Sequence, residues 1–325
     1  MTTSLIATQL ERLVYADKGP KVVALGGGHG LAVTLRAVRS YAGEITAVVA
    51  VADDGGSSGR LTSGLGIPPP GDIRRCLLAL TPDRTIWAEL FEYRFAGGDI
   101  EDHSLGNLLL AALSEITGDF GAAVEVAGRM LQIVGRVVPA ANKAAELRAL
   151  VDGQEIVGQA EITKTRGIAS ISLAPEDLEP NPTALAAIAG ADQIILGPGS
   201  LFTSLLAVLL VPGIAEAWQK SAARKVFVLN LIDQDGETMG LSGADHLRIL
   251  AATGRIGGPG VVVVHDGRLS LPARHEAITV DADTALAWGW DVATADVVDP
   301  DADWPEHQAT SLGKMLASLA NQFTD

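Results

Sequence analysis

Short, continuous apolar runs recur along the chain, and most of them end directly in loops rich in glycine or polar residues. The first run is KVVALGG from Lys21, and the second is ITAVVAV just before Asp53. A helical pattern from Leu31 to Tyr41 lies between them, so this segment predicts a β-α-β unit with a right-handed crossover. Strands that are apolar on both faces are typical of a parallel sheet covered by helices.

The pattern changes in the middle of the chain and then returns to alternating strands and helices. After a loop at 53–71, helices are expected at about 72–81, 84–95, 104–116 and 119–132. Four β-like stretches with few helix signals follow, GRVVPA, ELRALV, QAEITK and IASISL, and they predict a small β-rich insertion at about 136–173. Beyond it, strands are expected in QIILGPG, KVFVLNL and VVVVHDG, and helices in SLFTSLLAVLL, in GADHLRILAATG and at about 307–322.

These elements predict an α/β fold, a Rossmann-like, doubly wound parallel sheet with a small β-rich insertion. We expect a single domain of this kind over 21–325, preceded by an amphipathic lead-in at 1–20. In such folds, ligands bind outside the carboxyl ends of the strands, near the point where the strand order reverses. The polar loops of this chain follow strands, so the ligand site is expected at that edge of the sheet.

Composition narrows the kinds of partner. The formal net charge of the 325 residues is −15, which disfavours binding to nucleic acid or to an acidic membrane surface. A small phosphorylated ligand remains compatible with this charge, because backbone N–H groups and a few arginines can hold it.

Three further features indicate a cytoplasmic protein that does not insert into a membrane. Cys76 is the single cysteine and lies in the apolar run CLLAL, which indicates a buried side chain and a reducing compartment. The longest apolar run is broken at Pro212 and Gly213, which makes it too short to span a bilayer. The N-terminal residues lack the pattern of a signal peptide.

Two glycine loops are candidate phosphate sites. Gly26–Gly30 follows the first strand and precedes a helix, where glycine lets the backbone approach a phosphate at the helix N-terminus. Leu31 stands where the G-x-G-x-x-G pattern has its last glycine, and no Gly-Lys-Ser/Thr follows, so a tight turn is the alternative. The second loop, Gly197–Ser200, offers another helix N-terminus, with Ser200 as its expected cap.

Four polar segments add candidate contacts. Asp53 and Asp54 begin DDGGSSGR and suit a ribose hydroxyl or a Mg²⁺ ion beside a diphosphate, the alternative being a solvated loop. Asp72 is either a helix N-cap or part of the site, and Arg74 faces either ligand or solvent. Asn107 lies inside an apolar helix and needs a partner, either ligand or backbone. The candidate ligand-binding residues are Gly27, Gly28, His29, Gly30, Asp53, Asp54, Ser57, Ser58, Arg60, Gly71, Asp72, Arg74, Asn107, Gly197, Gly199, Ser200 and Asn230, with Asp53 and Asp54 as candidate metal ligands.

The residues by themselves indicate binding rather than catalysis. The sequence shows no zinc-ligand spacing, no nucleophile elbow and no ordered catalytic triad. It therefore supports binding of a phosphorylated nucleotide and leaves the catalytic residues unassigned.

In their order, these loops resemble the YvcK family of gluconeogenesis factors. The resemblance rests on GGGxGL, ADDGGSSGRL, PPGDIRRCLLAL, HSLGNLLLAAL, GPGSLFTSLL and GLSGADHL, and it covers about 21–322. The pair DDGGSSGR and PPGDIR is its most specific part. The family is similar in fold to the 2-phospho-L-lactate transferases of deazaflavin-coenzyme biosynthesis.

The resemblance implies a regulator that binds UDP-N-acetylglucosamine and supports cell shape and cell-wall precursor supply during growth on gluconeogenic carbon. It further implies a regulated protein partner in amino-sugar or cell-wall metabolism, and it leaves a homo-oligomer open. The alternative is a Mg²⁺-dependent, phospholactate-type transferase acting on a guanosine diphosphate-linked donor. An NAD-dependent oxidoreductase is disfavoured, because the third glycine and an evident acid/base pair for hydride transfer are missing.

The chain departs from the family pattern at two places. His29 stands where the family usually has Thr, which bears on the phosphate contact. Glu306-His307-Gln308 corresponds to the family's Arg-His-Asp segment before the last helix. The contacts that the C-terminal third makes with a nucleotide sugar therefore stay open.

Overall fold

The computed structural model describes residues 19–52, 65–82, 85–98 and 103–321. Within them the strands of the main sheet are β1 Lys21–Gly26, β2 Glu44–Val49, β3 Arg136–Pro139, β7 Gln193–Leu196, β8 Arg224–Val228, β9 Gly260–His265 and β10 Trp290–Ala295, and those of the small sheet are β4 Glu146–Val151, β5 Gln154–Val157 and β6 Ser170–Ala174. The helices are α2 Gly28–Val38, α4 Pro70–Leu80, α5 Ile86–Glu92, α6 Leu105–Thr117, α7 Phe120–Leu131, α8 Gln159–Ile162, α9 Pro182–Ala189, the π-helix η1 Leu201–Leu206, α10 Ala207–Leu209, α11 Ile214–Lys220, α12 Gly243–Ala252, α13 Ala282–Ala287 and α14 Ala309–Asn321.

The main sheet reverses its strand order between β1 and β7. In the described part of the chain its order is β10-β9-β8-β7-β1-β2-β3, and each neighbouring pair is parallel. Leu25 of β1 is in register with Val48 on one side and with Leu196 on the other. The predicted doubly wound parallel sheet is confirmed, and its reversal places the loops after β1 and β7 side by side.

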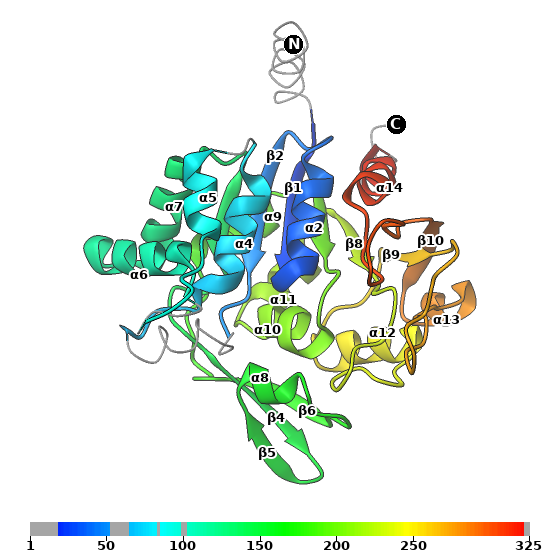
Figure 1. Cartoon of the computed structure of the whole chain (residues 1–325). Helices are drawn as coiled ribbons and strands as arrows, with labels where there is room; N and C mark the ends of the chain where they lie inside the picture. The colour runs from blue at the N-terminus through cyan, green and yellow to red at the C-terminus, as the bar shows by residue number, and fades with distance from the viewer. Residues whose placement is uncertain (1–18, 53–64, 83–84, 99–102, 322–325) are drawn as a thin grey trace, which may run out of the picture.

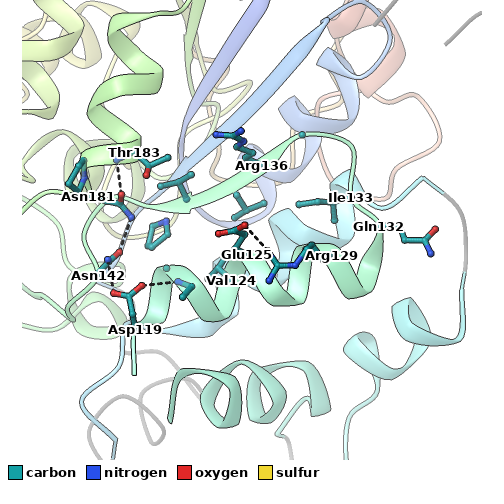
Figure 2. A pocket seen from close by; sticks show the side chains of 18 residues that line it. Asp119, Val124, Glu125, Arg129, Gln132, Ile133, Arg136, Asn142, Asn181 and Thr183 are labelled. Carbon is teal, nitrogen blue, oxygen red and sulfur yellow. Dashed lines mark hydrogen bonds and ion pairs between the residues drawn. The ribbon is translucent and has the colours of Figure 1, made fainter. Parts of the chain in front are cut away.

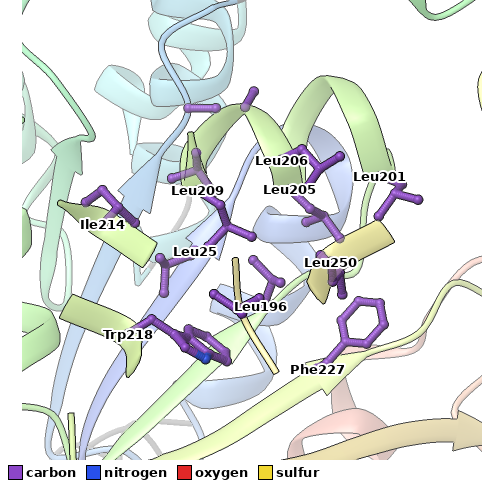
Figure 3. Close-up of a cluster of buried hydrophobic side chains, with 14 of the residues drawn as sticks. Leu25, Leu196, Leu201, Leu205, Leu206, Leu209, Ile214, Trp218, Phe227 and Leu250 are labelled. Atoms are coloured by element: carbon purple, nitrogen blue, oxygen red, sulfur yellow. The ribbon is translucent and has the colours of Figure 1, made fainter. Parts of the chain in front are cut away.

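Helices cover both faces of the sheet, because strands such as β1 have apolar side chains on both faces. Val23 and Leu25 of β1 pack on one face, whereas Val22 and Ala24 pack on the other, as alternation along a strand requires. On the face of Val23, side chains of η1, α10 and α11 surround Leu25, Leu196 and Phe227, with Trp218 fully buried (Figure 3). On the opposite face α2 packs between α4 and α14 (Figure 1).

The helices expected between 72 and 132 are confirmed as α4, α5, α6 and α7. Local capping explains the starts of α5, α6 and α7, because Thr85, Ser104 and Asp119 each accept a hydrogen bond from a first-turn N–H. Cys76 on α4 is buried, as the sequence indicated.

The β-rich insertion is smaller than predicted. Residues 136–139 form β3, which pairs with β2 at the edge of the main sheet, so they do not belong to the insertion. The expectation of a strand in QAEITK was wrong, because Gln159–Ile162 forms the helical turn α8, which buries Ile162. The small antiparallel sheet has the order β5-β4-β6 and projects from the main body (Figure 1). Its hairpin turns at Asp152 and Gly153, both with positive φ, a signal that Asp-Gly carries in sequence.

Within the described ranges, no single helix is long and apolar enough to cross a membrane. The segments Leu201–Leu209 and Ile214–Lys220 meet those criteria only as a pair, and they are bent by 74° against each other. Every residue of η1 in the first of these segments is buried in the core.

Candidate functional site

The loop after β1 leaves backbone exposed at the start of α2. Gly27 is the extended N-cap residue, and Gly28 has a φ of 64°, in the left-handed region that favours glycine. No described atom lies within 4 Å of the position that a Cβ on Gly28 would occupy. Among the described residues, nothing therefore covers this side of the turn.

Asp72 holds this turn from α4. Its Oδ2 accepts a hydrogen bond from the Gly28 N–H at 2.7 Å, and its Oδ1 accepts one from Arg75 at 2.7 Å. The residue is only 5% exposed. Asp72 is not the cap of α4, because the N-cap position belongs to Pro69, and Gly71 lies beside it in the first turn. The Gly28 N–H group, at the N-terminus of α2, is therefore already hydrogen-bonded to a carboxylate of the protein.

The loops after β1, β7 and β8 are locked together at the reversal point. A Cβ on Gly30 would lie 2.2 Å from the Pro198 carbonyl oxygen, so only glycine fits. Thr34 donates from Oγ1 to the Gly197 carbonyl at 2.8 Å. The Asn230 side chain accepts from the Gly199 N–H at 3.0 Å and donates to the Gly199 carbonyl at 2.9 Å. Residues predicted from three separate loops therefore lie in one place.

The second helix N-terminus also holds a carboxylate of the protein. Ser200 is the N-cap residue of η1, but its side chain makes no capping hydrogen bond. Instead, Glu237 from the loop after β8 accepts hydrogen bonds from Thr203, including its Oγ1 at 3.1 Å, from the Phe202 N–H and from Ser200. Glu237 is 3% exposed, and burial raises its pKa to about 7 against the opposing effect of these hydrogen bonds. Sequence reasoning assigned no role to Glu237.

Arg74 and Asn107 are hydrogen-bonded to each other inside the protein. Arg74 Nε donates to Asn107 Oδ1 at 3.1 Å, and Arg74 also donates to the Phe91 carbonyl at 3.4 Å. Both side chains are buried, and burial lowers the pKa of Arg74 to about 10, which leaves it positively charged at neutral pH. Arg74 therefore makes these hydrogen bonds inside the protein, and it also lines a hollow of about 440 Å³ that His29 borders.

A cavity of about 400 Å³ opens at the reversal point. Its walls are His29 and Gly30 of α2, the loops after β7 and β8, His275, and residues 304–307. His275 and Asp233 form a buried pair on one wall, with 3.0 Å between Nδ1 and Oδ1. Burial would raise the pKa of Asp233, but hydrogen bonds from Glu276 N–H, Gly240 N–H and His275 outweigh it and lower the pKa below its usual value.

Two residues of this cavity carry buried polar atoms without a partner in the described part of the chain. They are Oε1 of Gln234 and Nε2 of His307. Burial lowers the pKa of His307 to about 4, so its ring is neutral at pH 7. Buried polar atoms in proteins are normally hydrogen-bonded, so these two are suited to a partner supplied by ligand or water.

Part of the predicted site falls outside the described residues, namely Asp53, Asp54, Ser57, Ser58 and Arg60. The expected Mg²⁺ ligands, Asp53 and Asp54, are among these residues. Among the residues that the structure does describe, no group of three or more His, Cys, Asp or Glu side chains is placed to hold a metal ion.

A larger groove, of about 860 Å³, lies between α7, β3 and α9, away from the reversal point (Figure 2). Its polar side chains pair with one another: Asn142 donates to Asp119 at 2.9 Å, and Asn181 donates to Asn142 at 2.8 Å. None of the groove residues is among the described side chains with buried, unpartnered polar atoms. The smaller cavity is therefore the better candidate for a ligand site.

Comparison with known proteins gives one consistent family. The family model for the 2-phospho-L-lactate transferase CofD matches residues 22–298. The gluconeogenesis factor of Halalkalibacterium halodurans is 44% identical over 256 residues, which cover 78% of this chain and 80% of that protein. The gluconeogenesis factor of Bacillus subtilis is 47% identical over 234 residues, which cover 71% of this chain and 74% of that protein.

Relatives differ in length, and solved structures share the fold. A Nostoc protein is 48% identical over 238 residues, and the match spans 52% of its length, about half. A crystal structure of a Bacillus halodurans protein superposes with a TM-score of 0.88 at 39% identity, covering 92% of this chain and 99% of the other.

Proposed function

The chain belongs to the CofD family and, within it, to the gluconeogenesis factors of the YvcK family, and from this premise we propose that it is a cytoplasmic regulator that binds UDP-N-acetylglucosamine. In this role it supports cell shape and cell-wall precursor supply during gluconeogenic growth. Binding of the nucleotide sugar changes how the protein acts on a partner in amino-sugar or cell-wall metabolism.

The observation that carries this proposal is the cavity at the reversal point. Three glycine or asparagine loops converge there, with Gly30 against Pro198 and Asn230 against Gly199. The cavity volume of about 400 Å³ lies within the range of small-molecule sites. Its walls include Gln234 and His307, each of which has a buried polar atom with no partner among the described residues.

The chemistry of the walls suits the parts of a nucleotide sugar. The first turn of α2 presents His29 and Gly30 to the cavity, and a helix N-terminus favours a diphosphate. Gln234 and His307 line the same cavity, and their polar side chains are of the kinds that bind hydroxyl or base groups. Trp304 is 47% exposed at the rim and provides an aromatic surface for a base.

A second candidate is a transferase that uses a guanosine diphosphate-linked donor. The match to the CofD family model favours it, since that model is named for a transferase. This candidate requires Mg²⁺, for which Asp53 and Asp54 are the ligands expected from sequence. The two functions therefore differ in nucleotide, in metal dependence and in the fate of the ligand.

Calorimetric titration with UDP-N-acetylglucosamine, GDP and NAD, with and without Mg²⁺, separates these functions. The regulator predicts selective binding of the UDP-sugar and recovery of that ligand unchanged. Selective, Mg²⁺-dependent binding of GDP would favour the transferase instead.

A matched pair of variants locates the site. Asn230→Ala removes both hydrogen bonds that hold Gly199, and we expect it to weaken binding about tenfold, because the loop at Gly199 is then no longer held in place beside the cavity. Asn142→Ala makes the same replacement in the larger groove and should leave the affinity unchanged. Equal effects of the two variants would argue against a site at the reversal point.

A further inference from the structure

His29 and Glu306 meet across the mouth of the cavity. Nε2 of His29 lies 3.1 Å from Oε2 of Glu306, although the two residues are 277 positions apart. Their side chains are 62% and 45% exposed, respectively, so the pair lies at the surface and not in the core. These are two positions at which the sequence departs from the family pattern, and the structure brings them into contact.

The backbone around Glu306 is held by hydrogen bonds, whereas its side chain is 45% exposed. The Glu306 carbonyl accepts a hydrogen bond from the Asp299 N–H at 2.7 Å, and the Gln308 N–H donates to the Val297 carbonyl at 2.8 Å. The segment is thus attached to the chain that follows β10. Rotation of the exposed Glu306 side chain can therefore release His29 without moving the backbone.

The carboxylate of Glu306 occupies a position that attracts anions. It contacts the side chain of His29, which lies in the first turn of α2. Arg36, two turns along α2, also feels this carboxylate: burial lowers the pKa of Arg36, and Glu306 opposes that shift.

His29 also borders a second hollow, of about 440 Å³, that Arg36 and Arg75 line. The pair therefore lies between this arginine-lined hollow and the cavity at the reversal point. A phosphate that approached His29 from either side would meet the negative charge of Glu306.

We propose that Glu306 is a built-in competitor for the phosphate groups of the ligand: its carboxylate occupies the anion position beside His29 and must leave before a phosphate takes its place. The identity of the ligand rests on the proposed function, whereas the competition applies to any phosphorylated ligand of the cavity. Binding is therefore weaker than the cavity alone would allow, and it is coupled to release of the His29–Glu306 contact.

Calorimetry on Glu306→Gln and Glu306→Ala tests this proposal, with UDP-N-acetylglucosamine, inorganic pyrophosphate and uridine as probes. Both variants should bind the two phosphorylated probes about 3- to 10-fold more tightly than the wild type, because a competing charge has been removed. Uridine carries no phosphate, so its affinity should not change. Asp303→Asn removes an equal charge from a nearby exposed residue that does not line the cavity, and it should change each affinity by less than about twofold.

The possible results distinguish a failure of the competitor role of Glu306 from a failure of the proposed ligand. Unchanged or weaker binding of both phosphorylated probes by Glu306→Gln and Glu306→Ala would overturn the competitor role, and so would an equal gain for uridine. Tighter binding of pyrophosphate without any binding of UDP-N-acetylglucosamine would support the competitor and reject the proposed ligand. Absence of binding by any probe to any folded variant would reject both.

Discussion

Replacing Glu237 by Gln removes the buried carboxyl that lies at the N-terminus of η1. Burial raises its pKa from the ordinary 4.5 to about 7, so the folded protein holds this proton more tightly than the unfolded chain does. The stabilisation linked to this proton is fully present below about pH 4.5 and is lost as the pH rises through about 7. The Gln variant cannot bind the proton and lacks this dependence.

The size of the effect follows from the two pKa values. A difference of one in pKa corresponds to about 1.4 kcal/mol, so the full change is about 3 kcal/mol, most of which falls between pH 5 and pH 8. We therefore expect the free energy of unfolding of the wild type, relative to that of Glu237→Gln, to fall by about 2–3 kcal/mol over this range. The side chain is almost fully enclosed, so solvent screening reduces this figure little.

Urea unfolding followed by circular dichroism at pH 5, 6, 7 and 8 measures this difference. Glu115→Gln makes the same replacement on the exposed surface of α6 and should keep the pH dependence of the wild type. If the difference in the free energy of unfolding between wild type and Glu237→Gln stayed constant with pH, it would contradict a raised pKa for Glu237. It would mean that Glu237 ionises like an exposed carboxyl, and that the η1 N-terminus carries a full negative charge throughout this range.

Two further predictions concern packing. In thermal unfolding, Gly30→Ala should destabilise the protein by about 1–3 kcal/mol, because the added Cβ would collide with the Pro198 carbonyl. The control Gly97→Ala should have little effect in the same assay, because no described atom lies within 4 Å of the added Cβ. In urea unfolding, Leu196→Ala should lower the free energy of unfolding by about 2–5 kcal/mol, because it opens a cavity between η1 and the sheet (Figure 3). The control Leu271→Ala, at a half-exposed position, should lower it by less than about 1 kcal/mol. Equal costs within either pair would contradict the packing described.

The sheet and its loops were predictable because their signals are local. A continuous apolar run that ends in glycines predicted β1 and the helix after it, although α2 begins at Gly28 and not at Leu31, and the same logic predicted β7 and the helix after it. The edge strand β3 was misplaced because four apolar or β-like residues give no sign of which sheet they join. The helical turn α8 was missed because its single buried residue, Ile162, fits a strand pattern equally well.

The chemistry of the site depends on contacts that sequence spacing does not reveal. Glu237 reaches Thr203 from 34 positions away, and Glu306 reaches His29 from 277 positions away. Glu237 lies at the N-terminus of η1, and Glu306 contacts a side chain in the first turn of α2, two places that by local sequence alone look available to a ligand's phosphate. Only the fold shows that the protein's own side chains hold these positions, together with Asp72 at Gly28.

A crystal structure of the protein with UDP-N-acetylglucosamine would show where the nucleotide sugar binds. We expect the diphosphate at the first turn of α2, against His29 and Gly30 and beside Pro198 and Gly199, with Glu306 turned away from His29. A nucleotide sugar bound in the groove between α7, β3 and α9 (Figure 2), or bound with the His29–Glu306 contact intact, would contradict it.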